Sequence, residues 1–284
     1  MPLAIVTDST CDLPAGELER LEVHRVPLYV SFRGATYRAW SDFHPADIVA
    51  GVEEGADLPT TSQPSPKDFE NAYREAVDGG ADQVLCITIT SELSGTFQSA
   101  NLATEEVDAP VTVFDSRAAS IGLGDMVRKA AEMRAAGADL EAIMGALEHI
   151  RDTNYLMFSP ATLEYLQKGG RIGRAQALMG SLLNVRPILS LRDGSIEPVG
   201  RVRGNKKLLK ELVANLKSYA AEATRPLRVS FVHIQDPEAA RSLKEAVDEA
   251  GIEYTSGGYY EMGAVIATHV GPGTYGYYAH TDPG

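Results

Sequence analysis

Hydroxyl side chains stand next to a glycine in a segment that follows an apolar run. Ser94, Gly95 and Thr96 come after the run at 84–90 and open a helical pattern at 96–106. The strand expected at 84–90 would therefore end at a helix N-terminus, where free N–H groups and the helix dipole favour an anion such as a carboxylate or a phosphate. Local sequence alone favours a simpler interpretation, in which Ser94 only caps the helix.

A second hydroxyl-rich segment lies between prolines. Ser65, Pro66 and Asp68 have the pattern of a helix start, with Ser65 as the N-cap, and this accounts for them structurally. Thr60, Thr61, Ser62 and Gln63 are left unexplained. Because the flanking prolines stiffen the segment, it could present the hydroxyls of Thr61 and Ser62 as preset donors, although an ordinary polar loop explains them equally well.

The first expected strand ends at Asp8, Ser9 and Thr10. This is the carboxyl edge of a predicted parallel sheet, where open α/β folds place their ligands. A carboxylate at Asp8 would repel an anion, so we expect Asp8 to organise neighbouring loops and regard Ser9 and Thr10 as candidate donors. The alternative is that all three residues only shape the turn.

A histidine closes the apolar run at 264–269, which we expect to be a strand. The imidazole of His269 can donate to a carboxylate and titrates near neutrality, although a lone histidine here is more often structural. Gly271, Gly273 and Gly276 match the spacing of a dinucleotide-binding loop. Only eight residues follow, too few for the helix, strand and acidic residue that such a site requires, so we expect no dinucleotide site.

Positive charge is concentrated in the second half of an acidic chain. Arg171 lies in a loop rich in glycine and arginine, and Arg201 and Arg203 follow further on, in a protein with a formal net charge of −13. Such a set could form a docking surface or face a phosphate. Solvated surface charge is the alternative.

The composition excludes several classes of protein. Its 284 residues are 44% hydrophobic and 23% charged, as in ordinary globular proteins. The acidic charge opposes non-specific binding to nucleic acid or to anionic lipid surfaces. Cys11 and Cys86 lack the spacing of a metal site, and no nucleophile elbow, Walker loop or zinc motif is present, so we expect neither metal nor cofactor. Without a signal peptide pattern or an apolar run of roughly 20 residues, we expect a cytoplasmic protein with no stable membrane insertion.

Two lobes are expected from the order of the elements. The first half alternates short β-rich runs with helical patterns, which predicts an α/β lobe with a parallel sheet at 1–155. The second half combines paired strands with helices, which predicts an α+β lobe at 156–284. Its expected strands are 187–191, 196–202, 227–233, 252–257 and 264–269, and its expected helices are 160–168, 175–183, 205–222 and 237–250.

In their order along the chain, these segments resemble the DegV family of bacterial fatty-acid-binding proteins. The matching motifs are 7–13, 60–64, 94–100, 165–172, 186–189, 193–194 and 268–273. Each motif is weak alone, but the ordered set is specific and spans nearly the whole chain. The resemblance implies two α/β lobes that enclose an acyl chain between them. It also implies a carboxylate held by Thr61 or Ser62, by Ser94 with Gly95, and by His269, with Asp8, Ser9, Thr10 and Thr96 in support.

The resemblance further implies a carrier that is not itself an enzyme. Such a carrier presents a long-chain fatty acid to a separate ATP-dependent fatty acid kinase, which makes an acyl phosphate for phospholipid synthesis. The kinase contacts would fall at Arg171, Arg201 and Arg203. One alternative is a Ser-dependent acyl hydrolase or transferase, with Ser94 activated by His269 and Asp8 orienting the imidazole. Another is a regulatory module that senses a small anion through the same loops.

Overall fold

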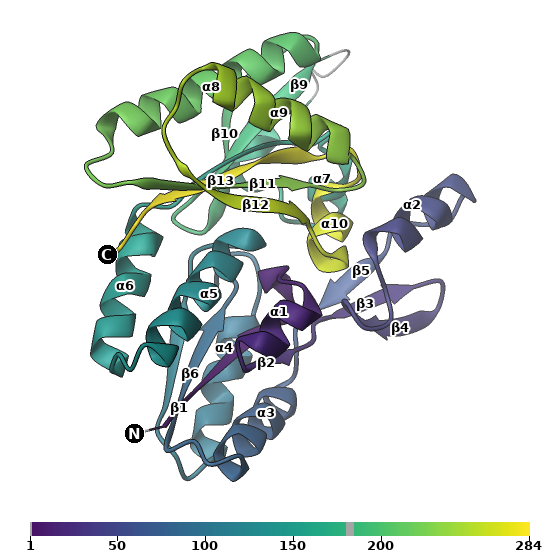
Figure 1. Ribbon diagram of the computed structural model, residues 1–284. Coiled ribbons are helices and arrows are strands. Elements are labelled where there is room, and N and C mark those ends of the chain that lie inside the picture. The colour runs from purple at the N-terminus through teal and green to yellow at the C-terminus, as the bar shows by residue number, and fades with distance from the viewer. Residues whose placement is uncertain (1, 180–184) are drawn as a thin grey trace. The chain divides into compact units, whose positions relative to one another are not determined.

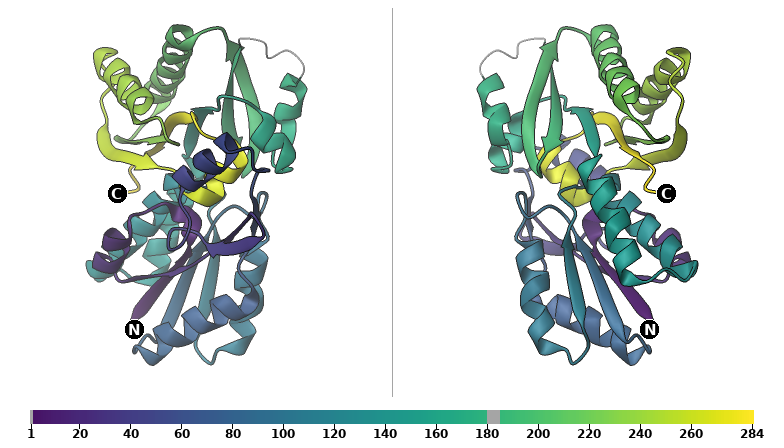
Figure 2. Two further views of the ribbon diagram at one scale, coloured as in Figure 1. Left: turned by 90° about the vertical axis from the view of Figure 1, so that its right-hand side faces the viewer. Right: turned by 90° about the vertical axis from the view of Figure 1, so that its left-hand side faces the viewer.

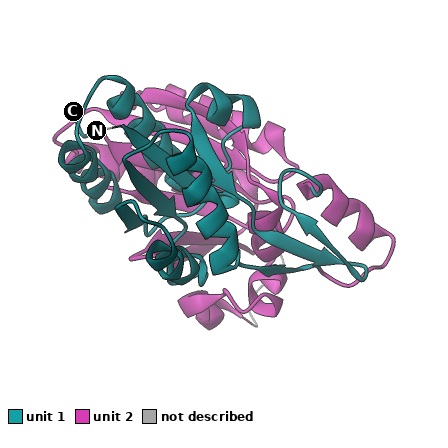
Figure 3. Ribbon diagram, turned by 90° about the horizontal axis from the view of Figure 1, so that it is seen from below, with its two compact units in different colours: residues 1–43, 59–152, 283–284 teal, residues 44–58, 153–282 magenta. Residues whose placement is uncertain are grey.

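The computed structural model of the chain describes residues 2–179 and 185–284. Its internal contacts group into two compact units, coloured separately in Figure 3. Unit 1 comprises Met1–Phe43, Pro59–Asp152 and Pro283–Gly284, and unit 2 comprises His44–Leu58 and Thr153–Asp282. A division of the lobes between 155 and 156 stays a prediction. The expected fold class, a parallel-sheet lobe followed by a second sheet-containing lobe, is confirmed.

Unit 1 is built on a parallel four-stranded sheet in the order β2-β1-β6-β7. The side chains of β1 and β6 are buried along nearly the whole strand, as expected when helices cover both faces of a parallel sheet. Because the strands are parallel, their carboxyl ends share one edge of the sheet. The strands are β1 (Leu3–Asp8), β2 (Val23–Val26), β6 (Gln83–Thr88) and β7 (Val111–Asp115).

Helices cover both faces of this sheet. Figure 2 shows α3 and α4 on one face and α5 on the other. Phe69 and Tyr73 of α3 and Ala100 of α4 pack with Val6 and Cys86 of the sheet. The helices of unit 1 are α1 (Ala15–Arg20), α3 (Pro66–Asp78), α4 (Thr96–Leu102), α5 (Ile121–Ala135) and α6 (Leu140–Asp152), with short 3-10 turns η1 (Ser9–Cys11) and η2 (Ala103–Glu106).

Helix α3 begins as the sequence predicts. The Ser65 hydroxyl accepts a hydrogen bond from the Asp68 backbone N–H at 3.2 Å, and the Asp68 carboxylate accepts one from the Ser65 backbone N–H at 2.8 Å. Pro66 occupies the first turn, where its missing N–H costs nothing. This capping box fixes the point at which the hydroxyl-rich segment ends.

The hydroxyl-rich segment itself forms a strand. A three-stranded antiparallel sheet has the order β4-β3-β5, with β3 (Tyr29–Phe32), β4 (Ala35–Arg38) and β5 (Thr60–Ser62). Thr61 pairs with Val30 in this sheet, and β5 is its edge strand. Three polar residues carry no alternation of apolar and polar side chains, so the sequence contains no strand signal here. Helix α2 (Pro45–Glu53) lies between β4 and β5 in the chain and belongs to unit 2.

Unit 2 contains a six-stranded sheet in the order β10-β9-β8-β13-β11-β12 (Figure 1). Strands β11 and β12 run parallel, whereas the pairs β10–β9, β9–β8, β8–β13 and β13–β11 are antiparallel. The hairpin between β9 and β10 turns at Asp193 and Gly194, which both have a positive φ, at 48° and 82°, as an Asp-Gly pair favours. The strands are β8 (Tyr155–Ser159), β9 (Arg186–Arg192), β10 (Ser195–Val202), β11 (Leu227–His233), β12 (Thr255–Glu261) and β13 (Tyr275–Thr281).

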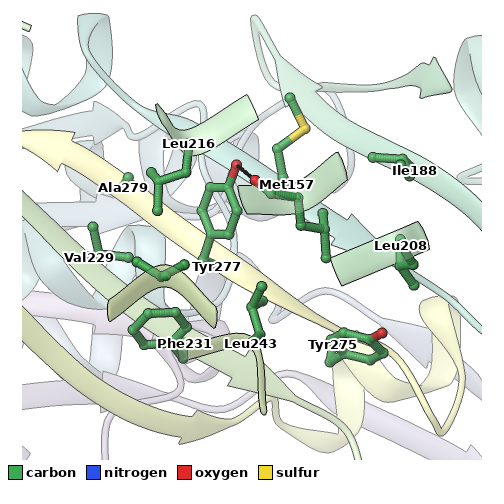
Figure 4. Close-up of a cluster of buried hydrophobic side chains, with 12 residues drawn as sticks. Met157, Ile188, Leu208, Leu216, Val229, Phe231, Leu243, Tyr275, Tyr277 and Ala279 are labelled. Carbon is green, nitrogen blue, oxygen red and sulfur yellow. Dashed lines mark hydrogen bonds between the residues drawn. The ribbon is translucent and has the colours of Figure 1, made fainter. Parts of the chain in front are cut away.

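Two long helices bury one face of this sheet. Leu208, Leu212 and Leu216 recur along α8 (Asn205–Glu222) at the spacing of one helix face and pack against the side chain of Tyr277. Helix α9 (Pro237–Glu249) adds Leu243 and Val247 to the same cluster, shown in Figure 4. The buried Tyr277 hydroxyl donates to the backbone carbonyl of Leu212 at 3.1 Å, so the core also satisfies its polar atom.

The prediction of a strand at 264–269 is wrong. These residues form helix α10 (Ala264–Val270), in which the Thr268 hydroxyl donates to the Ala264 carbonyl at 2.8 Å. Periodicity cannot separate a short buried helix from a buried strand in so brief an apolar run. The remaining strand of the sheet is β13, which the sequence analysis did not expect because its interior glycine lowers the strand signal.

Other boundaries in unit 2 also differ from prediction. The strand expected at 252–257 is β12, displaced toward the C-terminus, and the helix expected at 160–168 is confined to α7 (Glu164–Lys168). Of the helix expected at 175–183, the first part is a 3-10 helix η3 (Gly173–Leu178), and 180–183 lie outside the described residues. No helix within 2–179 and 185–284 is long and apolar enough to cross a membrane.

We predict opposite effects from the same substitution at two glycines. A Cβ at Gly276 would overlap the Met157 carbonyl and lie 2.7 Å from the Phe158 Cα, so Gly276→Ala should destabilise the protein by about 1–3 kcal/mol. Gly145 is exposed within α6 with open space around it, so Gly145→Ala should stabilise by about 0.5–1 kcal/mol. Urea unfolding measures both, and a neutral Gly276→Ala would contradict the close approach of β13 to β8.

Candidate functional site

Ser94 lies in the loop between β6 and α4, and its hydroxyl is partly buried. Its Oγ is 2.8 Å from the Oγ1 of Thr96, which is fully buried, and it accepts a longer hydrogen bond of 3.4 Å from the Thr96 backbone N–H. The residue at the cap position of α4 is Gly95, so the simple interpretation of Ser94 as the N-cap is replaced by a paired hydroxyl arrangement. A hydroxyl pair of this kind can donate one proton to an acceptor outside the pair.

Gln63, which the sequence leaves without an assigned role, joins this loop to the hydroxyl-rich strand. The Nε2 of Gln63 donates to the Gly95 carbonyl at 3.1 Å and to the Ser99 Oγ at 2.9 Å. Gln63 directly follows Ser62, the last residue of β5. The structure therefore links the segment containing Thr61 and Ser62 with the loop containing Ser94 and Gly95. The signal in the sequence was a polar residue between prolines that the capping box did not explain.

Asp8 holds the ends of two strands together. Its fully buried carboxylate accepts hydrogen bonds from the Thr10 backbone N–H at 2.9 Å, the Thr10 Oγ1 at 2.5 Å and the Ile89 backbone N–H at 2.7 Å. Burial raises the pKa of Asp8, and these hydrogen bonds oppose that shift because they favour the charged form. The carboxylate thus connects the turn after β1 to the residue after β6.

Ser9 and Thr10 both serve the turn after β1. The Ser9 hydroxyl accepts a hydrogen bond from the Leu28 backbone N–H at 2.9 Å, and both residues are buried. The Thr10 hydroxyl donates to Asp8. These bonds give the two residues a structural part in unit 1, next to the loops that carry Ser94 and Gly95.

In unit 2, His269 packs against a glycine from a distant segment. A Cβ at Gly169 would overlap the Nδ1 of His269 and would lie 3.0 Å from the Tyr165 carbonyl. A Cβ at Gly271 would lie 2.5 Å from the Cδ2 of the Tyr165 ring, and Gly271 also has a φ of 81° that favours glycine. The motifs at 165–172 and 268–273 are therefore packed together within one unit.

The environment of His269 keeps its imidazole neutral. Burial, together with the smaller effect of the positive charge of Arg171, lowers the pKa of His269 to about 4. The Nη1 of Arg171 donates to the Gly169 carbonyl at 2.8 Å, which holds the guanidinium beside the loop. At neutral pH this part of unit 2 offers a neutral ring N–H and a neighbouring cation, a combination suited to an anionic oxygen.

A second arginine fixes the loop that follows His269. The Nη2 of Arg186 donates to the carbonyls of Gly273 at 3.2 Å and Ser159 at 3.3 Å, and its guanidinium lies 5.6 Å from the centre of the Tyr275 ring. These contacts connect the ends of β8 and β9 to the turn before β13. They explain structurally why an arginine begins the motif at 186–189.

The other expected basic residues are on the surface of unit 2. Arg201 lies near the end of β10, Arg203 follows that strand, and both are exposed. Lys206 and Lys207 continue the positive charge into the first turn of α8, which has no acidic residue. Cations at a helix N-terminus are unfavourable for the helix dipole, so this surface is one where an anionic group would be favourable.

The contacts do not favour the hydrolase alternative. A catalytic relay needs a carboxylate that orients a basic imidazole. The Asp8 carboxylate accepts hydrogen bonds from Thr10 and Ile89, and the low pKa of His269 makes its imidazole a weak base. In the described ranges, no group of three or more His, Cys, Asp and Glu side chains is placed to hold a metal ion.

Comparisons with known proteins identify the family. The DegV family model matches residues 2–282. A DegV domain-containing protein of Deinococcus radiodurans is 41% identical over 97% of each chain, and a fatty acid-binding protein of Thermotoga maritima is 36% identical over 98% of this chain and 97% of the relative.

A solved structure is similar over the full length. The structure of a DegV family protein from Thermus thermophilus, described for its fatty acid binding, has a TM-score of 0.95 and 47% sequence identity, and covers 99% of this chain and 100% of its own. The Thermotoga maritima and Thermus thermophilus proteins are both described as binding fatty acids. The match across both units, together with the ordered motifs, shows that the chain belongs to the DegV family.

Proposed function

We propose that this protein is a carrier for one long-chain fatty acid. The carboxylate of the fatty acid is held by Thr61 or Ser62, by Ser94 with Gly95, and by His269. One observation carries the proposal. Gln63, the residue after β5, donates hydrogen bonds to Gly95 and Ser99, and so joins the segment that contains Thr61 and Ser62 to the loop that contains Ser94. The fatty acid binding described for relatives of the same length supports the choice of ligand.

The energetics assign different tasks to the two ends of the ligand. Burying about fifteen methylenes gains roughly 12 kcal/mol at about 0.8 kcal/mol each, before the costs of association and ordering are subtracted. A carboxylate without partners costs several kcal/mol to remove from water. Hence the tail supplies affinity and the polar side chains supply orientation. Asp8, Ser9, Thr10 and Thr96 support the head-group residues by fixing the loops that carry them.

The finer part of the proposal concerns a protein partner. A carrier that holds an acid without activating it requires a separate fatty acid kinase, which would form the acyl phosphate used in phospholipid synthesis. The exposed Arg201 and Arg203 are proposed to contact the kinase, together with Arg171 of the motif at 165–172. Their positive charge stands out in a chain of net charge −13 and would steer an acidic partner. We propose a cytoplasmic location for this carrier.

We predict that the protein purified from a bacterial host retains an acyl ligand. Native mass spectrometry should show a population heavier than the chain by the mass of one fatty acid, and organic extraction should remove that mass. A chain that carries no such mass after expression, and that binds neither palmitate nor oleate added to it, would contradict the carrier proposal. It would instead favour a module that senses a small anion.

Ser94→Ala and His269→Ala should each weaken fatty acid binding. Each removes one donor to a charged group, worth about 1.5–3 kcal/mol, so the Kd for palmitate should rise about 10-fold to 150-fold. Displacement of a fluorescent fatty acid measures the Kd. Ser256→Ala, at an exposed position of β12, is the matched control and should leave the Kd unchanged. Parental affinity in both Ser94→Ala and His269→Ala would remove the head-group assignment.

Reversing the exposed charges should separate coupling from binding. The double variant Arg201→Glu with Arg203→Glu is expected to bind palmitate with the parental Kd and to lower the rate of kinase-dependent acyl phosphate formation about tenfold or more. Arg241→Glu, an exposed charge reversal on α9, is the control and should retain the full rate. If the double variant couples as well as the parent, the kinase does not dock on this surface.

A further inference from the structure

Gln63 makes an unusually close approach to Gly95. If Gly95 carried a Cβ, that atom would overlap the Oε1 of Gln63 and would lie 2.7 Å from both its Cδ and its Nε2. The φ of Gly95 is −72°, which any residue adopts. A larger residue at 95 would therefore require the carboxamide of Gln63 to move, because this carboxamide lies directly against the Gly95 backbone.

The orientation of the carboxamide follows from its partners. The Gly95 carbonyl can only accept a hydrogen bond, so the Nε2 of Gln63 must face it, at 3.1 Å. The same nitrogen donates to the Ser99 Oγ at 2.9 Å, on the first turns of α4, where Ser99 is buried. One side chain thus spans from the end of β5 to the start of α4.

Strand β5 is a short strand at one edge of its sheet. Its three residues pair with β3 through Tyr29–Ser62, Val30–Thr61 and Ser31–Thr60. Thr60 and Ser62 are exposed, so little side-chain packing resists fraying of the strand. A tether on Gln63 supplies a second attachment, on the side of the loop that carries Ser94.

We propose that Gln63 is the positioning residue of the carboxylate site, and that Gly95 is glycine in order to admit it. This inference rests on the proposed function. It attributes the fixed positions of the carboxylate's donors in unit 1 to the hydrogen bonds of one side chain. Gln63 does not contact the carboxylate; it holds the end of β5, and with it the hydroxyl of Thr61 or Ser62, in place beside the loop that carries Ser94. Donors that are already fixed lose less entropy when the ligand binds, so the tether raises affinity for the acidic head group.

Removing the Gln63 hydrogen bonds should weaken binding of the charged head group and leave binding of the apolar tail unchanged. Gln63→Met keeps the length of the side chain and removes its donor, so we expect the Kd for palmitate to rise about tenfold while the Kd for hexadecanol, which has the same tail and no charge, stays within about twofold. Gln98→Met, at an exposed position of α4, is the matched control and should change neither value.

A pair of substitutions tests the close approach itself. Gly95→Ala should displace the carboxamide and weaken palmitate binding at least as much as Gln63→Met. In Gly95→Ala with Gln63→Ala the overlap is gone, so the double variant should bind no worse than Gln63→Ala alone. Additive losses in the double variant would overturn the proposal.

Hydrogen exchange gives a test that needs no ligand. In Gln63→Met the amides of Thr61 and Ser62 should exchange faster, whereas those of α3 should keep the parental rate. Parental exchange and parental palmitate affinity in Gln63→Met would overturn the positioning role while leaving the carrier proposal intact. An equal loss of affinity for palmitate and hexadecanol would assign Gln63 to general stability and also overturn it. A parent that binds no palmitate would end both proposals.

Discussion

A carboxylate that leaves water must meet hydrogen-bond donors, and this requirement organises the candidate site. Flexible donors lose conformational entropy when they bind the carboxylate, and this loss offsets the electrostatic attraction. They bind more tightly if the fold fixes them before the ligand arrives. In unit 1 the fixing is done by polar bonds that do not face the ligand, from Asp8 to the turn after β1 and from Gln63 to the loop before α4. The hydroxyls proposed to face the carboxylate are thus supported by hydrogen bonds that are buried around Asp8 and partly buried or exposed around Gln63.

Close backbone approaches are the common device at these positions. Gly95 admits Gln63, Gly169 admits the His269 ring, and Gly271 admits the Tyr165 ring. At each of them a Cβ would displace a side chain from its observed place, so glycine marks where two segments distant in sequence are packed together. Only Gly271 also needs glycine for its φ. Glycines in the motifs therefore report tertiary contacts rather than turns alone.

Much of unit 1 could be predicted from local patterns, and much of the candidate site could not. The alternation of strands and helices and the Ser65 capping box are local, and both were predicted. The strand β5 and the Gln63 contacts depend on pairing with residues about thirty positions away. In unit 2, the short run at 264–269 was compatible with either a strand or a helix. It forms the helix α10, and β13 takes the place in the sheet that this run was expected to fill.

The neutral state of His269 bears on how a carrier can both hold and release an acid. A fully charged imidazolium buried beside a carboxylate would form an ion pair that resists separation in a low-dielectric site. Burial and the adjacent Arg171 disfavour that charge, so in the proposed site the imidazole would contribute a hydrogen bond of moderate strength. Affinity would then reside mainly in the apolar tail, whose interaction has no directional requirement. A head group that forms no ion pair with this imidazole would be released more readily, which suits the proposed carrier role.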